Sequence, residues 1–294
     1  MGRKGGGPGE FVSPCCLAID AKGRLWVRDL GNKRYVVLQL RRGAPFAVPA
    51  YVVALKSNAG GYTTRTVFDD AGRVIDAGTD NTTSGLVRIT IGSAGAERQR
   101  VTLAPPVTGV SAVAKMPKKT PGGQAVYFVY PPFPGYALNA TGLHGEAAIA
   151  GSGDYRVRWY AGNGSLIREI TRTDVGPSVT PDERREADSA MVAEAREFGT
   201  TPAALGFRMP ARKPVLRNLW FDDDGRLWVE LTTARGSARR AHVYSRTGKL
   251  ESIAEWPANV ELSEFSVIRG DEAWSVAHDA DEVPTIVRLR FIAR

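Results

Sequence analysis

Asp222–Val229 reads Asp-Asp-Asp-Gly-Arg-Leu-Trp-Val, and this stretch decides the fold of the chain. Asp20–Val27 repeats it as Asp-Ala-Lys-Gly-Arg-Leu-Trp-Val, and a weaker copy, Asp-Asp-Ala-Gly-Arg-Val-Ile, occupies Asp69–Ile75. In each copy Gly follows the first Asp by three residues, between two apolar runs. The Asp side chain can cap backbone N–H groups, and Gly adopts the positive φ of a tight turn. Each copy therefore predicts a β-hairpin, and their repetition predicts radially repeated sheets.

A second glycine turn recurs at a near-constant distance from the first. The two glycines are 23 residues apart from Gly72 to Gly95 and again from Gly225 to Gly248. Two hairpin turns at this separation predict a four-stranded antiparallel meander. The alternative is one long meander with glycines placed by chance, which does not account for the repeated spacing.

We therefore predict an all-β fold, a β-propeller of four-stranded antiparallel blades with one helical insertion. Five blades are recognisable, the last with three strands, and residues 1–294 are expected to form a single domain. The expected parts are an inter-blade linker at 1–12, blades at 13–56, 62–104, 134–171, 215–257 and 263–292, and insertions at 105–133 and 172–214.

The second insertion is expected to hold a helix over residues 181–198. Thr180 is a good N-cap, Pro181 suits the first helical position, and Glu183 completes a capping box. Gly199 is suited to end the helix. The apolar stripe of this helix is expected to pack on the sheets rather than to bind a cofactor.

The net charge of +8 and the pI near 9.6 raise the possibility of a nucleic-acid partner. The basic residues are dispersed and often lie beside acids, and no ladder of aromatic and basic residues is visible. We therefore expect no nucleic-acid binding. No apolar run approaches the roughly 20 residues of a membrane span, and Met1–Pro8 lacks the apolar stretch of a signal peptide.

The two cysteines, Cys15 and Cys16, are adjacent. A vicinal disulfide is one possibility, but neighbouring residues of a strand point to opposite faces. We therefore favour two buried free thiols. With no second pair and no nearby His, zinc binding is unsupported.

Residues 14–34 closely resemble one NHL-type repeat, with Pro-Cys-Cys-Leu-Ala-Ile-Asp before the turn and an Asp, an Asn and an Arg after it. Residues 2–11 look like the linker between blades of bacterial six-bladed β-propeller proteins, and residues 222–257 resemble a later blade. The middle blades match only in turn spacing, and Cys15-Cys16 replaces the usual small residue. The resemblance implies six blades and a periplasmic or secreted location for the full-length protein.

The final unit ends at Ile292 with three strands, and residues 5–9 are too rich in Gly to supply a fourth. In the family that the chain resembles, this Gly-rich segment joins two blades. We therefore expect that the chain lacks an N-terminal blade, and that the missing region could carry an export signal.

Some propellers are lyases that use histidines, and others are lactonases that use a carboxylate-bound metal. The three histidines here, His144, His242 and His278, fall on different parts of a blade and are not expected to converge. We expect no catalytic residues, no metal site and no cofactor. Because carboxylates from inner strands leave no local motif, a metal-dependent propeller lyase or lactonase-like hydrolase stays the alternative.

The two turn families lie on one face of a propeller, and the inter-blade connections and the loops between second and third strands lie on the other. Both insertions are inter-blade connections, and rigid folds carry binding sites on such variable loops. We therefore predict a non-catalytic binding or scaffold protein with a protein, peptide or glycan ligand on the inter-blade-loop face. The candidate residues are Arg28, Asp29, Asp76, Asp154 and Glu230. The alternative role of each is ion pairing between blades.

Overall fold

The computed structural model describes residues 3–292 except for residues 8, 41–47, 55–65, 69–71, 80–85, 92–96, 105–106, 108–109 and 121–122. Residues 69–71 of the weak turn copy and the second-turn Gly95 therefore lie outside the described residues, whereas Gly72 of that copy has the expected positive φ of +69°. The described residues form an all-β propeller of five small antiparallel sheets. The fold class predicted from the repeated turns is confirmed.

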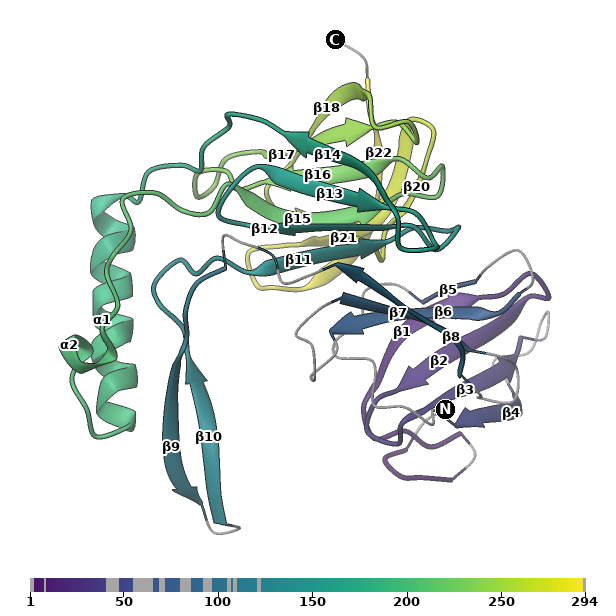
Figure 1. Ribbon diagram of the computed structural model, residues 1–294, viewed down its shortest axis with the longest axis horizontal. Coiled ribbons are helices and arrows are strands. Elements are labelled where there is room, and N and C mark those ends of the chain that lie inside the picture. The colour runs from purple at the N-terminus through teal and green to yellow at the C-terminus, as the bar shows by residue number, and fades with distance from the viewer. Residues whose placement is uncertain are drawn as a thin grey trace.

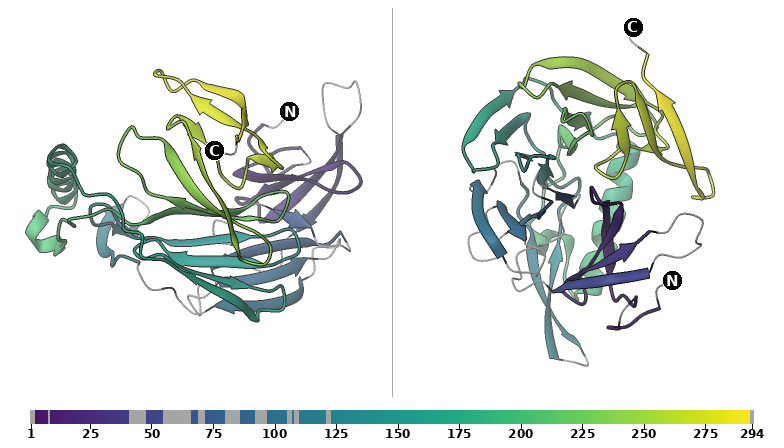
Figure 2. Two further views of the ribbon diagram at one scale, coloured as in Figure 1. Left: turned by 90° about the horizontal axis from the view of Figure 1, so that it is seen from above. Right: turned by 90° about the vertical axis from the view of Figure 1, so that its right-hand side faces the viewer.

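The five blades follow one another in chain order around a common centre, from the purple first blade to the yellow last blade (Figure 2). Within blades 1–4 each strand pairs antiparallel with the next. Their strands are β1 (Pro14–Ile19), β2 (Arg24–Asp29), β3 (Arg34–Gln39) and β4 (Val48–Ala54); β5 (Val67–Phe68), β6 (Val74–Thr79), β7 (Leu86–Ile91) and β8 (Glu97–Ala104); β11 (Ala137–Thr141), β12 (Ala147–Gly151), β13 (Arg156–Tyr160) and β14 (Leu166–Thr171); and β15 (Leu216–Phe221), β16 (Leu227–Leu231), β17 (Arg239–Tyr244) and β18 (Leu250–Trp256).

Blade 5 has a different order. Its strands are β19 (Val260–Glu261), β20 (Val267–Arg269), β21 (Glu272–His278) and β22 (Pro284–Arg290). β19 and β20 both pair with the same edge of β21, and β22 pairs with the other edge. The two short strands thus share the innermost position of the blade, β21 takes the second position and β22 takes the third.

The repeated turn is organised around one carboxylate. Asp222 accepts hydrogen bonds from the backbone N–H groups of Asp224 (3.0 Å) and Arg226 (2.8 Å). Its second oxygen accepts from the Arg226 Nε (2.7 Å) and from the indole of Trp228 (2.8 Å). Gly225 closes the turn at a φ of +75°.

Asp20 makes the same set of contacts in blade 1. It accepts from the N–H groups of Lys22 and Arg24, from the Arg24 side chain and from the indole of Trp26 at 2.9 Å. Gly23 adopts a φ of +71°. The Asp, Gly, Arg and Trp of the motif therefore form one hydrogen-bonded unit.

Aromatic side chains pack adjacent blades together. Trp26 of blade 1 lies 5.5 Å from Phe68 of blade 2, between ring centroids. The centroids of Trp228 of blade 4 and Phe291, directly after β22, are also 5.5 Å apart. Each motif Trp is therefore hydrogen-bonded to the Asp of its turn and packs against an aromatic ring of the next blade.

The two insertions pack on each other beside the blades (Figure 1). The first contains the hairpin of β9 (Ala114–Thr120) and β10 (Gly123–Val129), and the second contains α1 (Pro181–Glu197) and the short α2 (Pro202–Leu205). Thr180 and Glu183 form the expected capping box. The expectation that the helix stripe packs on the propeller sheets needs correction, because the helical insertion buries its apolar residues with β9 and β10.

In the part of the chain that the structure describes, no helix is long and apolar enough to cross a membrane.

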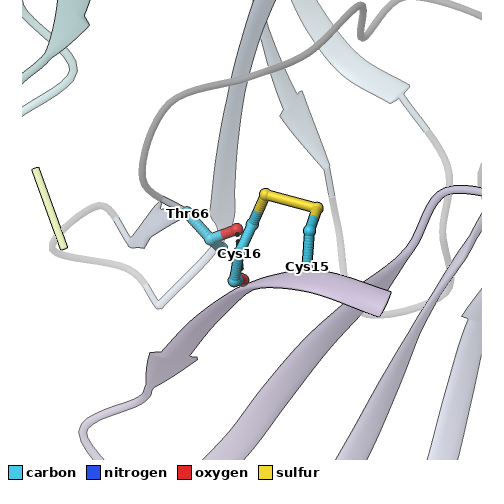
Figure 3. The surroundings of a disulfide bond; sticks show 3 residues. All are labelled: Cys15, Cys16 and Thr66. Atoms are coloured by element: carbon cyan, nitrogen blue, oxygen red, sulfur yellow. Dashed lines mark hydrogen bonds between the residues drawn. A yellow bond between two sulfur atoms is a disulfide. The ribbon is translucent and has the colours of Figure 1, made fainter. Parts of the chain in front are cut away.

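The prediction of two free thiols is wrong, because Cys15 and Cys16 form a disulfide. The pairing of β1 with β2 is irregular between Cys15 and Ala18, and Cys16 has a φ of +56°. This bulge breaks the alternation of side chains and leaves both sulfur atoms on one side of β1 (Figure 3). Thr66, just before β5, donates to the Cys16 carbonyl at 3.1 Å.

We expect Gly225→Val to destabilise the protein more than Gly162→Val. A β-branched residue at positive φ costs about 1–2 kcal/mol. A Cβ at Gly225 would also lie 2.7 Å from Arg246 Nε. Gly162 is a turn residue without a positive φ. Thermal unfolding of the two variants measures the difference, and equal midpoints would contradict the assigned turn geometry.

Candidate functional site

A pocket of about 580 Å³ lies where the loop between β12 and β13 meets the connections that enter and leave blade 3. Those are the second-to-third-strand loop and the inter-blade connections, so the pocket is on the face where the sequence predicts a ligand. The lining residues are Val110, Ser111, Phe133, Gly135, Gly153, Asp154, Tyr155, Arg172, Thr173, Asp174, Val175, Gly176, Arg212, Lys213, Pro214 and Val215.

The two stems of the helical insertion form one wall of the pocket. They pair through hydrogen bonds from the Val179 N–H to the Ala211 carbonyl (3.0 Å) and from the Lys213 N–H to the Pro177 carbonyl (2.9 Å). A Cβ at Gly176 would lie 1.9 Å from the Lys213 carbonyl oxygen, so only glycine permits this approach. The wall is therefore fixed by backbone contacts.

Three cationic side chains line the pocket, and each has a different partner. Arg172 Nε lies 2.8 Å from an Asp174 carboxylate oxygen. Lys213 pairs with Glu183 at the start of α1 and lies over the Phe133 ring. The Nη1 of Arg212 donates to the Gly176 carbonyl at 3.0 Å, which is its one hydrogen-bond acceptor within the described residues. A guanidinium has five N–H donors, so Arg212 keeps donors for a ligand.

A buried hydrogen-bonded chain lies under the pocket. The Tyr155 hydroxyl is 2.9 Å from His242 Nδ1 and 2.9 Å from the Tyr244 hydroxyl. All three side chains are buried, and the Arg172 guanidinium carbon lies 6.0 Å from the centroid of the Tyr155 ring. Burial lowers the pKa of His242 and raises the pKa of Tyr155 and of Tyr244. Burial therefore favours the neutral form of all three side chains.

Three of the five predicted site residues are fully buried and take part in contacts within the fold. Asp29 accepts from the backbone N–H groups of Val12 and Ser13, each at 3.1 Å. Glu230 pairs with Arg239 at 2.8 Å, and burial raises its pKa. Arg28, on β2, is 1% exposed.

The other two predicted residues lie in different blades. Asp154 lines the pocket. Asp76 is on β6, but its side chain is outside the described residues. Sequence reasoning therefore placed one of its five candidates at the pocket and missed Arg172, Arg212 and Lys213. Their positions in the sequence could have identified these three residues, because they lie at the two ends of the predicted insertion.

Within the described ranges no group of three or more His, Cys, Asp or Glu side chains could hold a metal ion. No family model and no curated protein sequence matches the chain.

Several solved structures align over most of the chain at low identity. A selenomethionine-substituted virginiamycin B lyase from Staphylococcus aureus is 12% identical, with a TM-score of 0.39, over 96% of this chain and 85% of that one. A protein of unknown function from Bacteroides caccae is 10% identical, with a TM-score of 0.44, over 94% and 77%. A putative 6-phosphogluconolactonase from Bacteroides fragilis is 10% identical, with a TM-score of 0.41, over 96% and 85%. Each TM-score is below 0.5, and the fold described above rests on the strand pairing of this chain.

We expect acidification to destabilise the protein through His242. Because burial lowers the pKa of folded His242, the unfolded chain takes up a proton that the folded chain does not. The free energy of unfolding is therefore not reduced by His242 above the unfolded pKa of about 6.5. It decreases as the pH falls below that value.

His242→Asn removes this titration and keeps an acceptor near the Nδ1 position. Urea unfolding between about pH 8 and pH 5 should show a smaller loss of stability in this variant than in the wild type. His144→Asn, at an exposed turn, is the control and should retain the wild-type dependence. An unchanged pH dependence in His242→Asn would contradict the assignment.

Proposed function

We propose that this chain is a β-propeller binding protein whose ligand occupies the pocket between Asp154 and Arg212. The observation that carries the proposal is the pocket itself, about 580 Å³ on the inter-blade-loop face, with an Arg212 guanidinium that keeps unused donors. Guanidinium groups bind carboxylates through paired hydrogen bonds. The ligand is accordingly a peptide or glycan that carries a carboxylate.

The rest of the lining supports this kind of ligand. Val110, Phe133 and Val175 give apolar contact area beside the cations, and Arg172 pairs with Asp174 and lies over the Tyr155 ring. Pockets that combine an apolar lining with a few fixed polar groups are typical of ligand sites. No step in binding requires the pocket residues to act as acid, base or nucleophile.

The alternative function is that of a metal-dependent propeller lyase or lactonase-like hydrolase. The described residues offer no group of metal ligands in its favour. Calorimetric titration with Ca²⁺ and with Zn²⁺ separates the two functions. Under our proposal neither ion binds tightly, and stoichiometric tight binding of either would favour the enzyme.

We also propose that the protein belongs to a bacterial family of six-bladed, NHL-type propellers and works in the periplasm or outside the cell. The resemblance of residues 14–34 supports the family. The Cys15–Cys16 disulfide supports the location, because disulfides persist in oxidising compartments. Alkylation of freshly lysed cells followed by mass spectrometry tests the location, and reduced cysteines in the native protein would contradict it.

We expect Arg212→Ala to weaken binding of an acidic ligand by about 10- to 100-fold, which corresponds to loss of a charge-assisted hydrogen-bonded pair. Candidate ligands come from a thermal-shift screen of acidic peptides and uronic-acid oligosaccharides. Affinities of the hits are then measured by calorimetry.

Arg246→Ala is the matched control, because Arg246 is an exposed arginine at the opposite, hairpin-turn face, where it donates to the Asp224 carbonyl. It should bind every hit as the wild type does. Equal affinity in Arg212→Ala and the wild type, or no hit from either ligand class, would contradict the proposed site.

A further inference from the structure

The hairpin of β9 and β10 has one covered face and one exposed face. Successive side chains of a strand point to opposite faces. Met116 and Val129 point to the same face and pack in the cluster that the hairpin shares with the helical insertion. Val126 and Phe128 point to the other face, where they are 55% and 54% exposed. The hairpin extends away from blade 3 alongside α1, which covers only the first of these faces (Figure 1).

The exposed face is a strip of apolar side chains with a positive charge in it. In the antiparallel pair Val126 lies opposite Pro117, and Phe128 lies opposite Lys115. Pro117 and Lys115 are both exposed, and Tyr130, directly after β10, is 48% exposed. We call these five residues the outer face of the hairpin. Exposed apolar side chains gathered in one strip are typical of a binding surface.

The outer face is continuous with the pocket, because the hairpin begins and ends there. Val110 and Ser111, shortly before β9, and Phe133 and Gly135, shortly after β10, line the pocket. The Ser111 N–H donates to the Gly135 carbonyl at 2.9 Å, and the Gly135 N–H donates to the Ser111 hydroxyl at 2.7 Å. These bonds hold the two ends of the hairpin together at the pocket. Since the helical insertion occupies the other face, a ligand that extends from the pocket along the hairpin meets the outer face.

The charge of this region favours an acidic partner. Residues 98–145 contain no Asp and no Glu, and β9 contains Lys115, Lys118 and Lys119. Lys118 pairs with Glu197 of α1 at 2.7 Å, whereas Lys115 is exposed across from Phe128. A surface that combines one sign of charge with apolar area attracts a ligand of the opposite charge and gains contact area when it binds.

We propose that the ligand is a peptide that places a carboxylate in the pocket and apolar side chains on the outer face, an inference that rests on the function proposed above. Pro117, Val126 and Phe128 offer no hydrogen-bonding side chain. The hydroxyls of a glycan would lose water against these residues without a replacement, whereas apolar side chains gain by leaving water. The outer face is therefore the apolar subsite of a site whose ionic subsite is Arg212.

Selection from a random peptide display library tests the two subsites separately. Selection on the wild type should enrich peptides that combine acidic residues with a neighbouring group of apolar residues. Phe128→Ser should lose the enrichment of apolar residues and keep that of acidic residues. Arg212→Ala should show the reverse.

Calorimetry then measures the contribution of the outer face. The probes are the most enriched peptide and a copy of it in which Ser replaces the apolar residues. Phe128→Ser should bind the enriched peptide about tenfold more weakly than the wild type does, because an apolar contact is lost. It should bind the Ser-containing copy as the wild type does.

Ile253→Ser is the matched control, since Ile253 is also 54% exposed but lies on β18, outside the pocket and the hairpin. It should bind both probes as the wild type does, and circular dichroism and thermal unfolding establish that all variants are folded. Peptides that depend on Arg212 but bind Phe128→Ser as tightly as the wild type would overturn the inference and leave the proposed function intact. Binding of uronic-acid oligosaccharides without any peptide would do the same. Peptides weakened by neither substitution would contradict both the inference and the proposed function.

Discussion

One buried carboxylate in each motif blade holds a tight turn and also positions the Trp that packs against the next blade. Asp222 holds the tight turn through two backbone N–H groups and fixes Trp228 through its indole. Trp228 then packs against Phe291, at the end of blade 5. Asp20 does the same for Trp26 in blade 1, where hydrogen bonds from Arg24 and Trp26 outweigh burial and hold the Asp20 pKa below its ordinary value. Turn geometry and blade packing therefore depend on one group in each motif blade.

This dependence explains what could be predicted from the sequence. The spacing from Asp to Gly to Trp is local, and it specifies hairpins without knowledge of distant residues. The disulfide could not be predicted, because it needs Cys16 at a positive φ inside an irregular strand pair. The pocket could not be predicted in full, because Arg172 and Arg212 come together only after the two ends of a long insertion pair with each other. Asp154 was accessible to prediction because topology alone places its loop on the ligand face.

The two faces of the array therefore have different roles. On one face, backbone N–H groups of the short turns already donate to Asp20 and Asp222. Few of these donors are therefore left for a ligand. The opposite face carries the insertions, whose stems build the pocket wall and whose Arg172 lies over the ring of the buried Tyr155.

A double-mutant cycle between Asp222 and Trp228 tests the central role of the turn carboxylate most directly. Asp222→Ala removes the acceptor, and Trp228→Phe removes the indole N–H while it keeps an aromatic ring in the contact between blades. Urea unfolding of the two single variants and the double variant gives the coupling energy. We predict a coupling of at least about 1 kcal/mol, as expected for a buried hydrogen bond to a charged group. Additive effects of the two substitutions would contradict the role that we assign to this carboxylate.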